Sequence, residues 1–503
     1  MNKHSERQLR RPIVVRPAAE VTTKSRRTRE SFMRALRSSV KDALKRQDLE
    51  CVVRKSHSRV YAETDEAGAE TAAQVLARVF GIGSFAVTKA TSSHELASIV
   101  QTGAAVFGDL VRGRRFAVRV KRSGHHPYTS VDVERELGAA LAPLGKVDLT
   151  RPEVTAYVEI TGTAAHFFDE NRPGPGGLPS GAGGHAVALL SGGFDSAVAA
   201  WYAMKRGLTL DYVFCNLGGD AYERQVVQVA KVLTDGWSFG ARPRMHVLDF
   251  QKPLAELQAN TREDLWQVVL KRLMYRAASL IARKCRAEAI VTGESLGQVS
   301  SQTLGNLRAI ETASELPVLR PLIGFDKQEI IAKSEELGTA PLSARVKEYC
   351  AISNVRPVVH SNPDDAAAEE AKLDSSLLET AVASARVVKL RSLKPADLII
   401  PYLFTDSLPH DAVVIDCQPR HMFEAWHAPG ARHFLPHELI ERARQLDKGR
   451  TYVLYCPYGT QSAHAAEVLQ QLGLDAYSFR GGTGALKRHL ERLTSGAPAA
   501  PPS

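Results

Sequence analysis

Cysteine is scarce in this chain of 503 residues, and long apolar runs are absent. No run approaches the roughly 20 apolar residues that span a bilayer, and the arginine-rich start has no apolar segment of the kind found in secretory signals. The six cysteines form no CxxC pair, which argues against a disulfide framework or a zinc site. We therefore expect a cytoplasmic protein with reduced thiols, without a membrane partner and without a metal site built from protein ligands.

The composition that remains is that of a globular protein. Hydrophobic residues make up 44% of the chain and charged residues 24%. Because 503 residues exceed what one hydrophobic core supports, we expect three or four domains. The formal net charge of +10 favours an acidic partner, although a basic surface also serves solubility alone.

One local pattern combines an apolar strand at Ala186–Leu190, a turn with two glycines and a helix. Paired glycines allow backbone N–H groups and the positive end of the helix to converge on an anion, and Ser191 and Ser196 add hydroxyl donors. The turn is not a Walker A loop, because no Gly-Lys-Ser/Thr follows the glycines. A strand-turn-helix corner without an anion site would have the same sequence pattern. A carboxylate beside a bound anion is repelled by it, so Asp195 is expected either to approach the anion through a metal ion or to act on a reaction intermediate.

Strands and helices alternate after this turn. The strings LDYVFCN, RMHVLDF and AEAIVTG have the composition of buried strands, and AYERQVVQVAKVL and LWQVVLKRLMYRAASLIARK that of helices. This alternation predicts a doubly wound parallel sheet with its ligand at the carboxyl ends of the strands. The loop 292–303 and the segment around Lys327 fall at such ends, although a capped helix and a surface lysine would explain them equally.

The first 170 residues predict two α+β modules. A strand at Pro12–Val15, a helix at Glu30–Arg46, two hairpin strands and a second helix fit a ferredoxin-like domain. Beyond it, the segment Arg115–Lys121 alternates apolar and basic residues. This predicts a strand with one cationic face that suits a phosphate backbone, and Arg122 extends the patch. A solvated strand face is the simpler alternative.

Near the C-terminus, the apolar strand TYVLY leads into Cys456 and a short turn that opens a helix at Ser462. Loop amides and the positive end of the helix favour a thiolate at Cys456, which makes it a better sulfur acceptor than a core thiol. An inert thiol at a strand end is the alternative. Four other cysteines are expected to be structural: Cys51, Cys215, Cys285 and Cys417.

These strings resemble known families. SGGFDS is similar to the pyrophosphatase-type P-loop of enzymes that split ATP between its α and β phosphates, and FAVRVKRSGHHPYTSVDVERELGAAL resembles a THUMP domain. The segment from Val413–Asp416 to the Cys456 loop resembles a rhodanese domain. Together with TGESLGQVSSQT and EYCAIS, residues from about 12 to 355 resemble the tRNA 4-thiouridine synthetases, or ThiI-type tRNA sulfurtransferases.

The resemblance implies ATP and Mg2+ as cofactors and tRNA as substrate. It implies that Asp195 and Cys456 are catalytic and that Cys350, in EYCAIS, is the thiol that resolves a disulfide with Cys456. The positions matched to the ATP site are Leu189, Leu190, Ser191, Gly192, Gly193, Ser196, Lys271, Gly293, Gln302 and Lys327. The residues expected to contact tRNA are Lys24, Arg115, Arg119, Lys121 and Arg122.

The predicted fold class is α/β multidomain, with ferredoxin-like and THUMP α+β modules, a doubly wound parallel-sheet PP-loop ATP pyrophosphatase domain and a C-terminal rhodanese α/β domain. The expected boundaries are a disordered basic tail at 1–11, a ferredoxin-like domain at 12–83, a THUMP domain at 84–170, a linker or mobile loop at 171–184, a PP-loop domain at 185–360, a helical connector at 361–395, a rhodanese domain at 396–495 and a disordered tail at 496–503.

The resemblance implies ATP-dependent conversion of uridine 8 of tRNA to 4-thiouridine, through adenylation of O4 and a persulfide on Cys456. Pro457 and Tyr458 stand where rhodaneses often have a basic residue, which favours a cysteine desulfurase over thiosulfate as the sulfur donor. Sulfur delivery toward the thiazole of thiamine through a sulfur-carrier protein is a further expectation. The oligomeric state stays open, with a homodimer among the options.

Three other classes of protein stay open at this point. A non-catalytic tRNA-binding protein would explain the basic N-terminal half, but it has no use for SGGFDS or the cysteine loop. A thiosulfate sulfurtransferase would explain only the C-terminal domain. An amidating ligase would share the P-loop, but the sequence contains no glutaminase-like segment.

Overall fold

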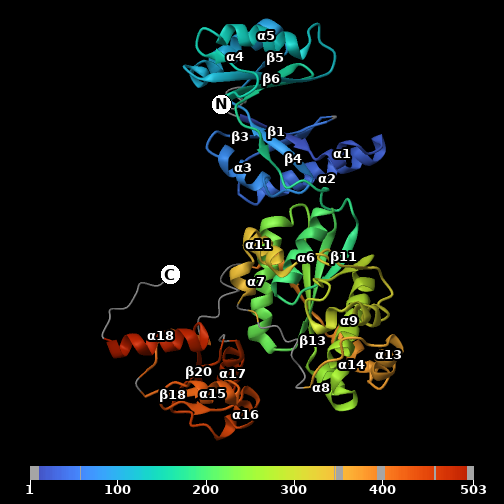
Figure 1. The fold of residues 1–503 in the computed structure, drawn as a ribbon, viewed down its shortest axis with the longest axis vertical. Helices are drawn as coiled ribbons and strands as arrows, with labels where there is room; N and C mark the ends of the chain where they lie inside the picture. Colours follow the sequence, from blue (N-terminus) through green and yellow to red (C-terminus); the bar gives the residue numbers. More distant parts are fainter. Residues whose placement is uncertain are drawn as a thin grey trace, which may run out of the picture. The chain divides into compact units, whose positions relative to one another are not determined.

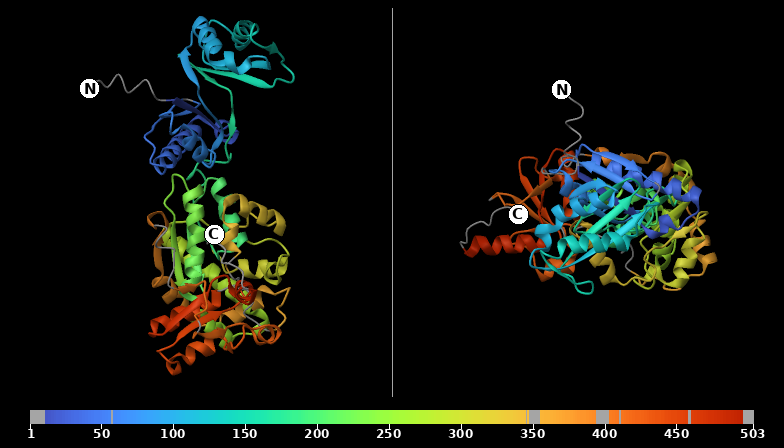
Figure 2. Two further views of the ribbon diagram at one scale, coloured as in Figure 1. Left: turned by 90° about the vertical axis from the view of Figure 1, so that its left-hand side faces the viewer. Right: turned by 90° about the horizontal axis from the view of Figure 1, so that it is seen from above.

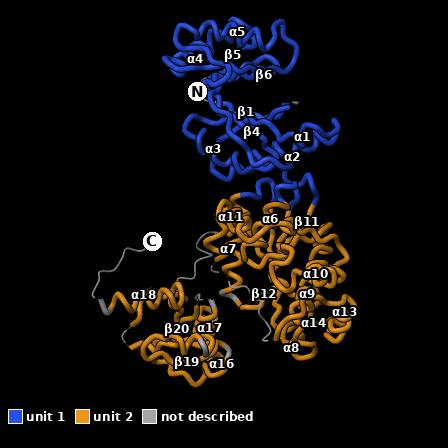
Figure 3. Tube along the Cα trace, in the orientation of Figure 1, with its two compact units in different colours: residues 1–184, 204–209, 237–241 blue, residues 185–203, 210–236, 242–503 orange. Residues whose placement is uncertain are grey.

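The computed structural model describes residues 11–56, 58–344, 346, 355–393, 403–409, 411–457 and 460–495. The chain forms two compact units (Figure 3). The first comprises residues 1–184, 204–209 and 237–241, and the second comprises the rest. Most of both predicted tails and the predicted resolving thiol, Cys350, lie outside the described residues, whereas Arg11 already belongs to a strand.

The first unit contains an antiparallel sheet in the order β10-β4-β1-β3-β2. Its elements are β1 (Arg11–Pro17), α1 (Ala19–Thr22), α2 (Arg26–Lys45), β2 (Val52–Lys55), β3 (Val60–Thr64), α3 (Ala69–Leu76), β4 (Ile82–Val87) and β10 (Arg172–Pro173). α2 and the shorter α3 pack on the sheet through a shared core, and Figure 2 shows the ribbon of this module from two further sides. The β-α-β-β-α-β order confirms the ferredoxin-like prediction. α2 begins at Arg26 rather than Glu30, because Ser25 takes the extended conformation of an N-cap.

The glycine- and proline-rich segment after residue 170 is not a free loop in this structure. Arg172 and Pro173 pair with β4, and Gly81 N–H donates to the Gly176 carbonyl over 2.8 Å. Leu178 packs against the core of the ferredoxin-like module. The prediction of a mobile loop is therefore wrong for this stretch, because its backbone groups find partners on the first sheet.

The second sheet of the first unit has the order β5-β9-β8-β6-β7. Its elements are β5 (Ala90–Ser93), α4 (Leu96–Val111), β6 (Arg115–Ser123), α5 (Ser130–Leu141), β7 (Lys146–Val147), β8 (Val154–Thr161) and β9 (Ala164–Phe168). Along β6, Phe116 and Val118 are buried whereas Arg115, Arg119 and Lys121 are exposed. The predicted cationic strand is confirmed.

The second unit contains a sheet in the order β15-β14-β11-β12-β13-β16 (Figure 1). Its elements are β11 (His185–Leu189), α6 (Phe194–Lys205), β12 (Thr209–Asn216), α7 (Gly219–Trp237), β13 (Arg244–Asp249), α8 (Gln251–Asn260), α9 (Trp266–Cys285), β14 (Ala289–Val291), α10 (Leu304–Glu311), β15 (Val318–Leu319), α11 (Lys327–Leu337), α12 (Ala340–Ser343), α13 (Pro363–Glu370), α14 (Ser375–Ala383) and β16 (Arg386–Lys389). β11 pairs in parallel with β14, β12 with β13, and β14 with β15, as predicted for a doubly wound sheet. β16, within the expected connector, adds an antiparallel edge strand beside β13.

The last part of the chain forms a five-stranded sheet in the order β17-β21-β20-β18-β19, with all its pairs parallel. Its elements are β17 (Phe404–Thr405), β18 (Val413–Asp416), α15 (Arg420–Ala425), β19 (Arg432–His433), α16 (Pro436–Glu441), β20 (Thr451–Tyr455), α17 (Thr460–Gln471), β21 (Asp475–Phe479) and α18 (Gly482–Ser495). α17 begins at Thr460, so Ser462, which was predicted to open the helix, lies in its first turn. None of the helices described is long and apolar enough to cross a membrane.

Candidate active site

A cavity of about 190 Å³ lies where β11, β12 and β14 reach their carboxyl ends. This is the place where ligands bind in doubly wound sheets. Among the positions matched to the ATP site, those in the cavity wall are Leu189, Leu190, Ser191, Ser196, Lys271, Gly293 and Gln302. Gly192, Gly193 and Lys327 lie outside the wall itself. The chain thus brings most of the predicted positions, which are scattered over 114 positions of sequence from Leu189 to Gln302, to one cavity.

The glycine turn after β11 has a conformation that only glycine accepts. Gly192 has φ of +80°, and a Cβ there would stand 2.9 Å from a methyl carbon of Val226. The two serines of the turn bond mainly to the turn itself: Ser191 N–H donates to Ser196 Oγ over 3.2 Å, and Ser196 Oγ donates to the Gly193 carbonyl over 3.2 Å. Their first role is to hold the turn in shape, a role that the sequence did not indicate.

Gly293, in the loop after β14, packs directly on the start of α6. A Cβ at this position would lie 2.6 Å from the Asp195 carbonyl carbon and 2.6 Å from the Ser196 nitrogen. Any side chain here would push the second loop away from the glycine turn. The glycine therefore allows two loops to share one wall of the cavity.

Asp195 is held by two side chains from a distant part of the chain. Lys327 Nζ lies 2.9 and 3.1 Å from the two carboxylate oxygens, and Gln298 Nε2 donates to Oδ2 over 2.8 Å. Lys327 also lies 5.5 Å from the centre of the Phe194 ring, within cation–π range. Sequence reasoning missed Gln298, because nothing in its local string separates it from its polar neighbours.

Lys271 reaches the cavity from α9 and is paired with a buried carboxylate. Its Nζ lies 3.1 Å from Glu294 Oε1, while Tyr275 Oη and Arg320 Nε donate to Glu294 Oε2 over 2.6 and 2.9 Å. Burial alone would raise the pKa of Glu294, but the Lys271 charge, the Tyr275 hydroxyl and Arg320 outweigh it and lower the pKa to about 2. Glu294 is thus a fixed anion that orients Lys271, and no local pattern in the sequence predicts this role.

The rest of the cavity wall is largely apolar. Val213 and Phe214 come from β12, and Leu270 and Met274 come from α9. An apolar slot beside a glycine turn and cationic side chains has the properties needed to hold a planar base next to phosphates.

Cys456 follows the last residue of β20 and is buried, with 1% of its surface exposed. Ser462 Oγ donates to its sulfur over 3.4 Å and lies 2.8 Å from Ser478 Oγ. The carbonyl of Cys456 accepts from Thr483 N–H over 3.0 Å. The thiol therefore sits at a strand end beside a helix N-terminus, in the predicted strand-cysteine-turn-helix order.

The basic side chains of β6 differ in how much of their charge is already balanced by neighbouring groups. Lys121 and Arg119 are exposed, and Arg119 Nη2 donates to the Leu149 carbonyl over 2.6 Å. Arg115 lies 3.6 Å from Asp148 and 3.7 Å from Glu153, so part of its charge is already balanced. In the ferredoxin-like module, Lys24 is exposed just before α2, whose first turn contains two arginines and no acid. Cations are unfavourable at a helix N-terminus, so this arrangement fits a surface meant for phosphates.

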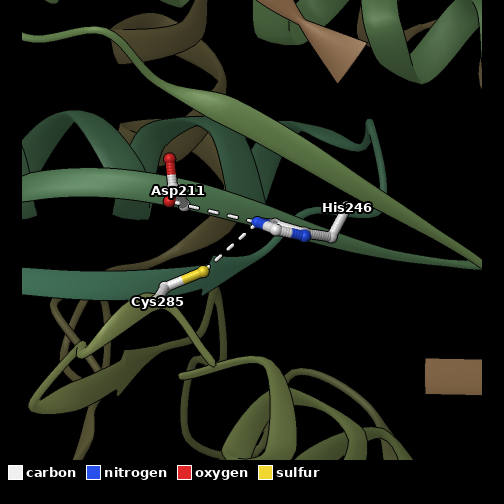
Figure 4. A group of neighbouring side chains, drawn as sticks. All are labelled: Asp211, His246 and Cys285. Atoms are coloured by element: carbon white, nitrogen blue, oxygen red, sulfur yellow. Dashed lines mark hydrogen bonds and ion pairs between the residues drawn. The ribbon is translucent and has the colours of Figure 1, made fainter. Parts of the chain in front are cut away.

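One group of possible metal ligands is found in the part of the chain that the structure describes (Figure 4). Figure 4 shows His246 between the Asp211 carboxylate and the Cys285 thiol, with Nε2 4.0 Å from Asp211 Oδ2 and 3.4 Å from the sulfur. Arg244 Nη2 already donates to the same Oδ2 over 2.7 Å. Since the Arg244 guanidinium occupies the Asp211 carboxylate, we interpret the cluster as a hydrogen-bonded network. Asp211 lies near the amino end of β12, whereas the cavity lies at the carboxyl ends of the strands.

Family models match the chain over most of its length. They are described as ThiI ferredoxin-like domain at residues 12–86, THUMP domain at 93–168, Thiamine biosynthesis protein (ThiI) at 181–375 and Rhodanese-like domain at 405–489. Each match falls on the part of the fold with the corresponding elements.

Curated relatives extend the match to nearly the whole chain. A tRNA sulfurtransferase of Pyrobaculum aerophilum is 38% identical over 480 residues, which cover 93% of this chain and 96% of the relative. A tRNA sulfurtransferase of Vibrio campbellii is 34% identical over 474 residues, covering 92% and 98%.

Solved structures agree with these relatives. A 4-thiouridine synthetase, solved as a complex with RNA and bound ATP, superposes with a TM-score of 0.67 at 30% identity and covers 76% of this chain and 99% of its own. The protein PH1313 from Pyrococcus horikoshii, with a TM-score of 0.53 at 23% identity, shares the fold over 65% of this chain. Because curated relatives that are 38% and 34% identical match 93% and 92% of its length, this chain belongs to the tRNA sulfurtransferase family.

Proposed function

We propose that this protein uses ATP to transfer sulfur to uridine 8 of tRNA and so makes 4-thiouridine. The observation that carries the proposal is the cavity at the ends of β11 and β14, where the glycine turn, Lys271 and Asp195 face the same space. The same chain contains Cys456 at the end of a rhodanese strand. An ATP site and a sulfur-carrying thiol together have a use only in ATP-driven sulfur transfer.

The first step activates the base. The phosphates of ATP lie against the amides of the glycine turn at the start of α6, and the adenine enters the apolar slot. O4 of the uridine attacks the α phosphorus and pyrophosphate leaves. Lys271 and Lys327 supply positive charge where negative charge develops, and Glu294 keeps Lys271 aimed at the cavity.

A magnesium ion fits this site. The Asp195 carboxylate and the Ser191 hydroxyl line the cavity and offer the hard oxygen ligands that Mg2+ prefers. When bound, the ion would neutralise charge on the departing pyrophosphate.

The second step moves sulfur. A cysteine desulfurase loads Cys456 as a persulfide, whose terminal sulfur attacks C4 of the adenylated uridine and displaces AMP. The Cys350 thiolate then attacks the Cys456 sulfur, so that 4-thiouridine leaves and a disulfide remains for a reductant to open. The exposed basic residues Lys24, Arg119 and Lys121 bind the phosphate backbone of the tRNA, with Arg115 and Arg122 beside Arg119 and Lys121 on the same strand.

A sulfur-carrier protein is a second acceptor to consider, because one matching family model is described as a thiamine biosynthesis protein. A carboxylate of such a carrier would be adenylated in place of uridine O4. The cavity residues would keep their roles, since both acceptors present a carbonyl-type oxygen to the α phosphorus.

The test is nucleoside mass spectrometry on unmodified tRNA incubated with the full-length protein, Mg-ATP, cysteine, a cysteine desulfurase and a reductant. We expect 4-thiouridine with the wild type and a loss of at least 100-fold in Asp195→Ala and in Cys456→Ala, because each removes a step rather than a contact. Asp235→Asn and Cys285→Ala, which change the same residue types outside the cavity and the loop, are expected to keep normal activity.

The outcomes separate the alternatives. The absence of 4-thiouridine with both variants is informative only if the wild type forms it, so the wild type is measured first. ATP cleavage to AMP without any thionucleoside would point to the sulfur-carrier protein as acceptor. Tight tRNA binding without ATP cleavage would identify a non-catalytic binding protein, and thiosulfate-driven transfer that ignores tRNA would identify a simple sulfurtransferase.

A further inference from the structure

Cys417, which the sequence analysis assigned to the core, lies directly opposite Cys456 in the rhodanese sheet. β18 and β20 pair in parallel, with Ile415 beside Leu454 and Asp416 beside Tyr455. Cys417 N–H donates to the Tyr455 carbonyl over 2.8 Å, which continues this register by one more residue. The two cysteines are therefore neighbours on adjacent strands, although 39 positions separate them in sequence.

Both thiols also lie on the same face of the sheet. Side chains alternate between faces along a strand, and Ile415, Cys417, Leu454 and Cys456 all belong to one buried cluster. Tyr455, between the last two, belongs to the cluster on the opposite face. Adjacent strands are about 4.8 Å apart, and disulfides join Cα atoms that are about 4.4 to 6.8 Å apart, so the strand spacing lies within the range that a disulfide spans.

We propose that Cys417 is a second resolving thiol, which closes a disulfide with Cys456 inside the rhodanese domain. The catalytic part of this inference rests on the proposed thiolation, whereas the pairing of the two thiols does not. Cys417 is held on the strand next to Cys456, so its attack needs no movement of another domain.

The reaction is balanced as follows. After sulfur attack on the base, C4 of the uridine is joined to Cys456 through two sulfur atoms. The Cys417 sulfur bonds to the Cys456 sulfur, and the bond between the Cys456 sulfur and the transferred sulfur breaks. The bonding electrons leave with the transferred sulfur, and the Cys417 proton goes to N3 of the released 4-thiouridine. The two cysteines have become a disulfide, which a dithiol reductant returns to two thiols.

Cys417 is a buried thiol before the reaction. Burial, the neighbouring Cys456 and the Asp416 carboxylate raise the pKa of the Cys417 thiol well above its usual range. Its attack on the Cys456 sulfur therefore requires the loss of this proton, which ends on N3 of the released 4-thiouridine.

The pairing is tested first, without tRNA or ATP. The full-length protein is treated with diamide, a thiol oxidant, and its peptides are mapped by mass spectrometry without reduction. We expect a cross-linked peptide pair that contains Cys417 and Cys456, which disappears in Cys417→Ala and persists in the control Cys285→Ala. Cross-linking of Cys456 to other cysteines only, or to none, would overturn the inference.

The catalytic role is tested in a single turnover without reductant, with protein that a cysteine desulfurase has loaded with sulfur. We expect Cys350→Ser to release 4-thiouridine and to contain the Cys417–Cys456 disulfide. The Cys350→Ser, Cys417→Ala double variant should release at least tenfold less, with tRNA retained on the protein as an adduct that dithiothreitol cleaves. Equal release by the single and the double variant would refute the role.

Two further measurements keep these results interpretable. Cys417→Val, which fills the core differently, should match Cys417→Ala in release, and melting curves identify a variant that has simply lost its fold. If the wild type makes no 4-thiouridine, the proposed thiolation fails, while the diamide experiment still decides whether the two thiols pair.

Discussion

Glu294 offers a test of how this fold holds its ATP site. Its side chain is almost fully buried and bonds to Lys271, Tyr275 and Arg320. In Glu294→Gln the side chain keeps its shape but loses its charge, so two cations are left beside a neutral amide. The substitution therefore removes the electrostatic part of the network and little of its packing.

The size of the effect follows from the shift in the pKa of Glu294. The pKa falls from an ordinary 4.5 to about 2, which corresponds to about 3 kcal/mol of stability at neutral pH. Breaking a buried ion pair costs about 3 to 5 kcal/mol, in agreement. Because the folded-state pKa is lowered, this stability is fully present above pH 4.5 and is lost as the pH falls toward 2.

The assay is amide hydrogen exchange along α9, which reports local opening. At pH 7 we expect exchange in Glu294→Gln to be about 100-fold faster than in the wild type, and the difference should narrow below pH 4.5. The matched control is Glu311→Gln, because Glu311 pairs with the same Arg320 but its side chain is 52% exposed. Exposed pairs contribute about 0 to 1 kcal/mol, so the control should exchange nearly normally. Exchange within threefold of the wild type in Glu294→Gln would refute the reasoning.

Three further changes test other parts of the molecule. Gly293→Ala should weaken ATP binding at least tenfold in equilibrium binding, because its Cβ meets the backbone of α6, whereas Gly324→Ala, with no atom within 4 Å, should bind normally; equal affinities would contradict the close approach. Lys121→Glu should raise the Kd for tRNA several-fold and reduce the slope of log K against log salt by about 1, with Lys252→Glu as a control and an unchanged slope as the contrary result. Glu159→Gln removes the carboxylate that Arg16 and Arg59 share, at a residue that is 1% exposed, so amide exchange in β8 should speed up by about 100-fold, and unchanged exchange would exclude a stabilising role.

Sequence periodicity predicted the long elements well and the short ones poorly. β6, α6 and α9 carry patterns of period 2 or 3.6 over many residues, and the structure contains them. β10 has two residues and β16 has four, and both are edge strands whose partners come from distant segments. Their pairing depends on tertiary packing. The sequence around β10 is rich in glycine and that before β16 is acidic and helical, so neither local pattern predicts a strand.

The candidate site shows the same division. The glycine turn and the strand-cysteine-turn-helix order are local, so the sequence reveals them. Glu294 and Gln298 act on Lys271 and Asp195 from other segments, and their roles appear only when the loops are assembled. Cys417 depends on β18 lying next to β20 in the sheet, and strand order in a parallel sheet is not a local property.

Gly293 also limits which single substitutions this chain can accept. Its hydrogen takes the place where any larger side chain would meet the backbone at Asp195 and Ser196. No rotamer change relieves such a contact, because backbone atoms cannot turn aside as side chains do. A larger residue at position 293 therefore fits only if the start of α6 also moves. The loop after β14 and the glycine turn before α6 therefore depend on each other for their shape.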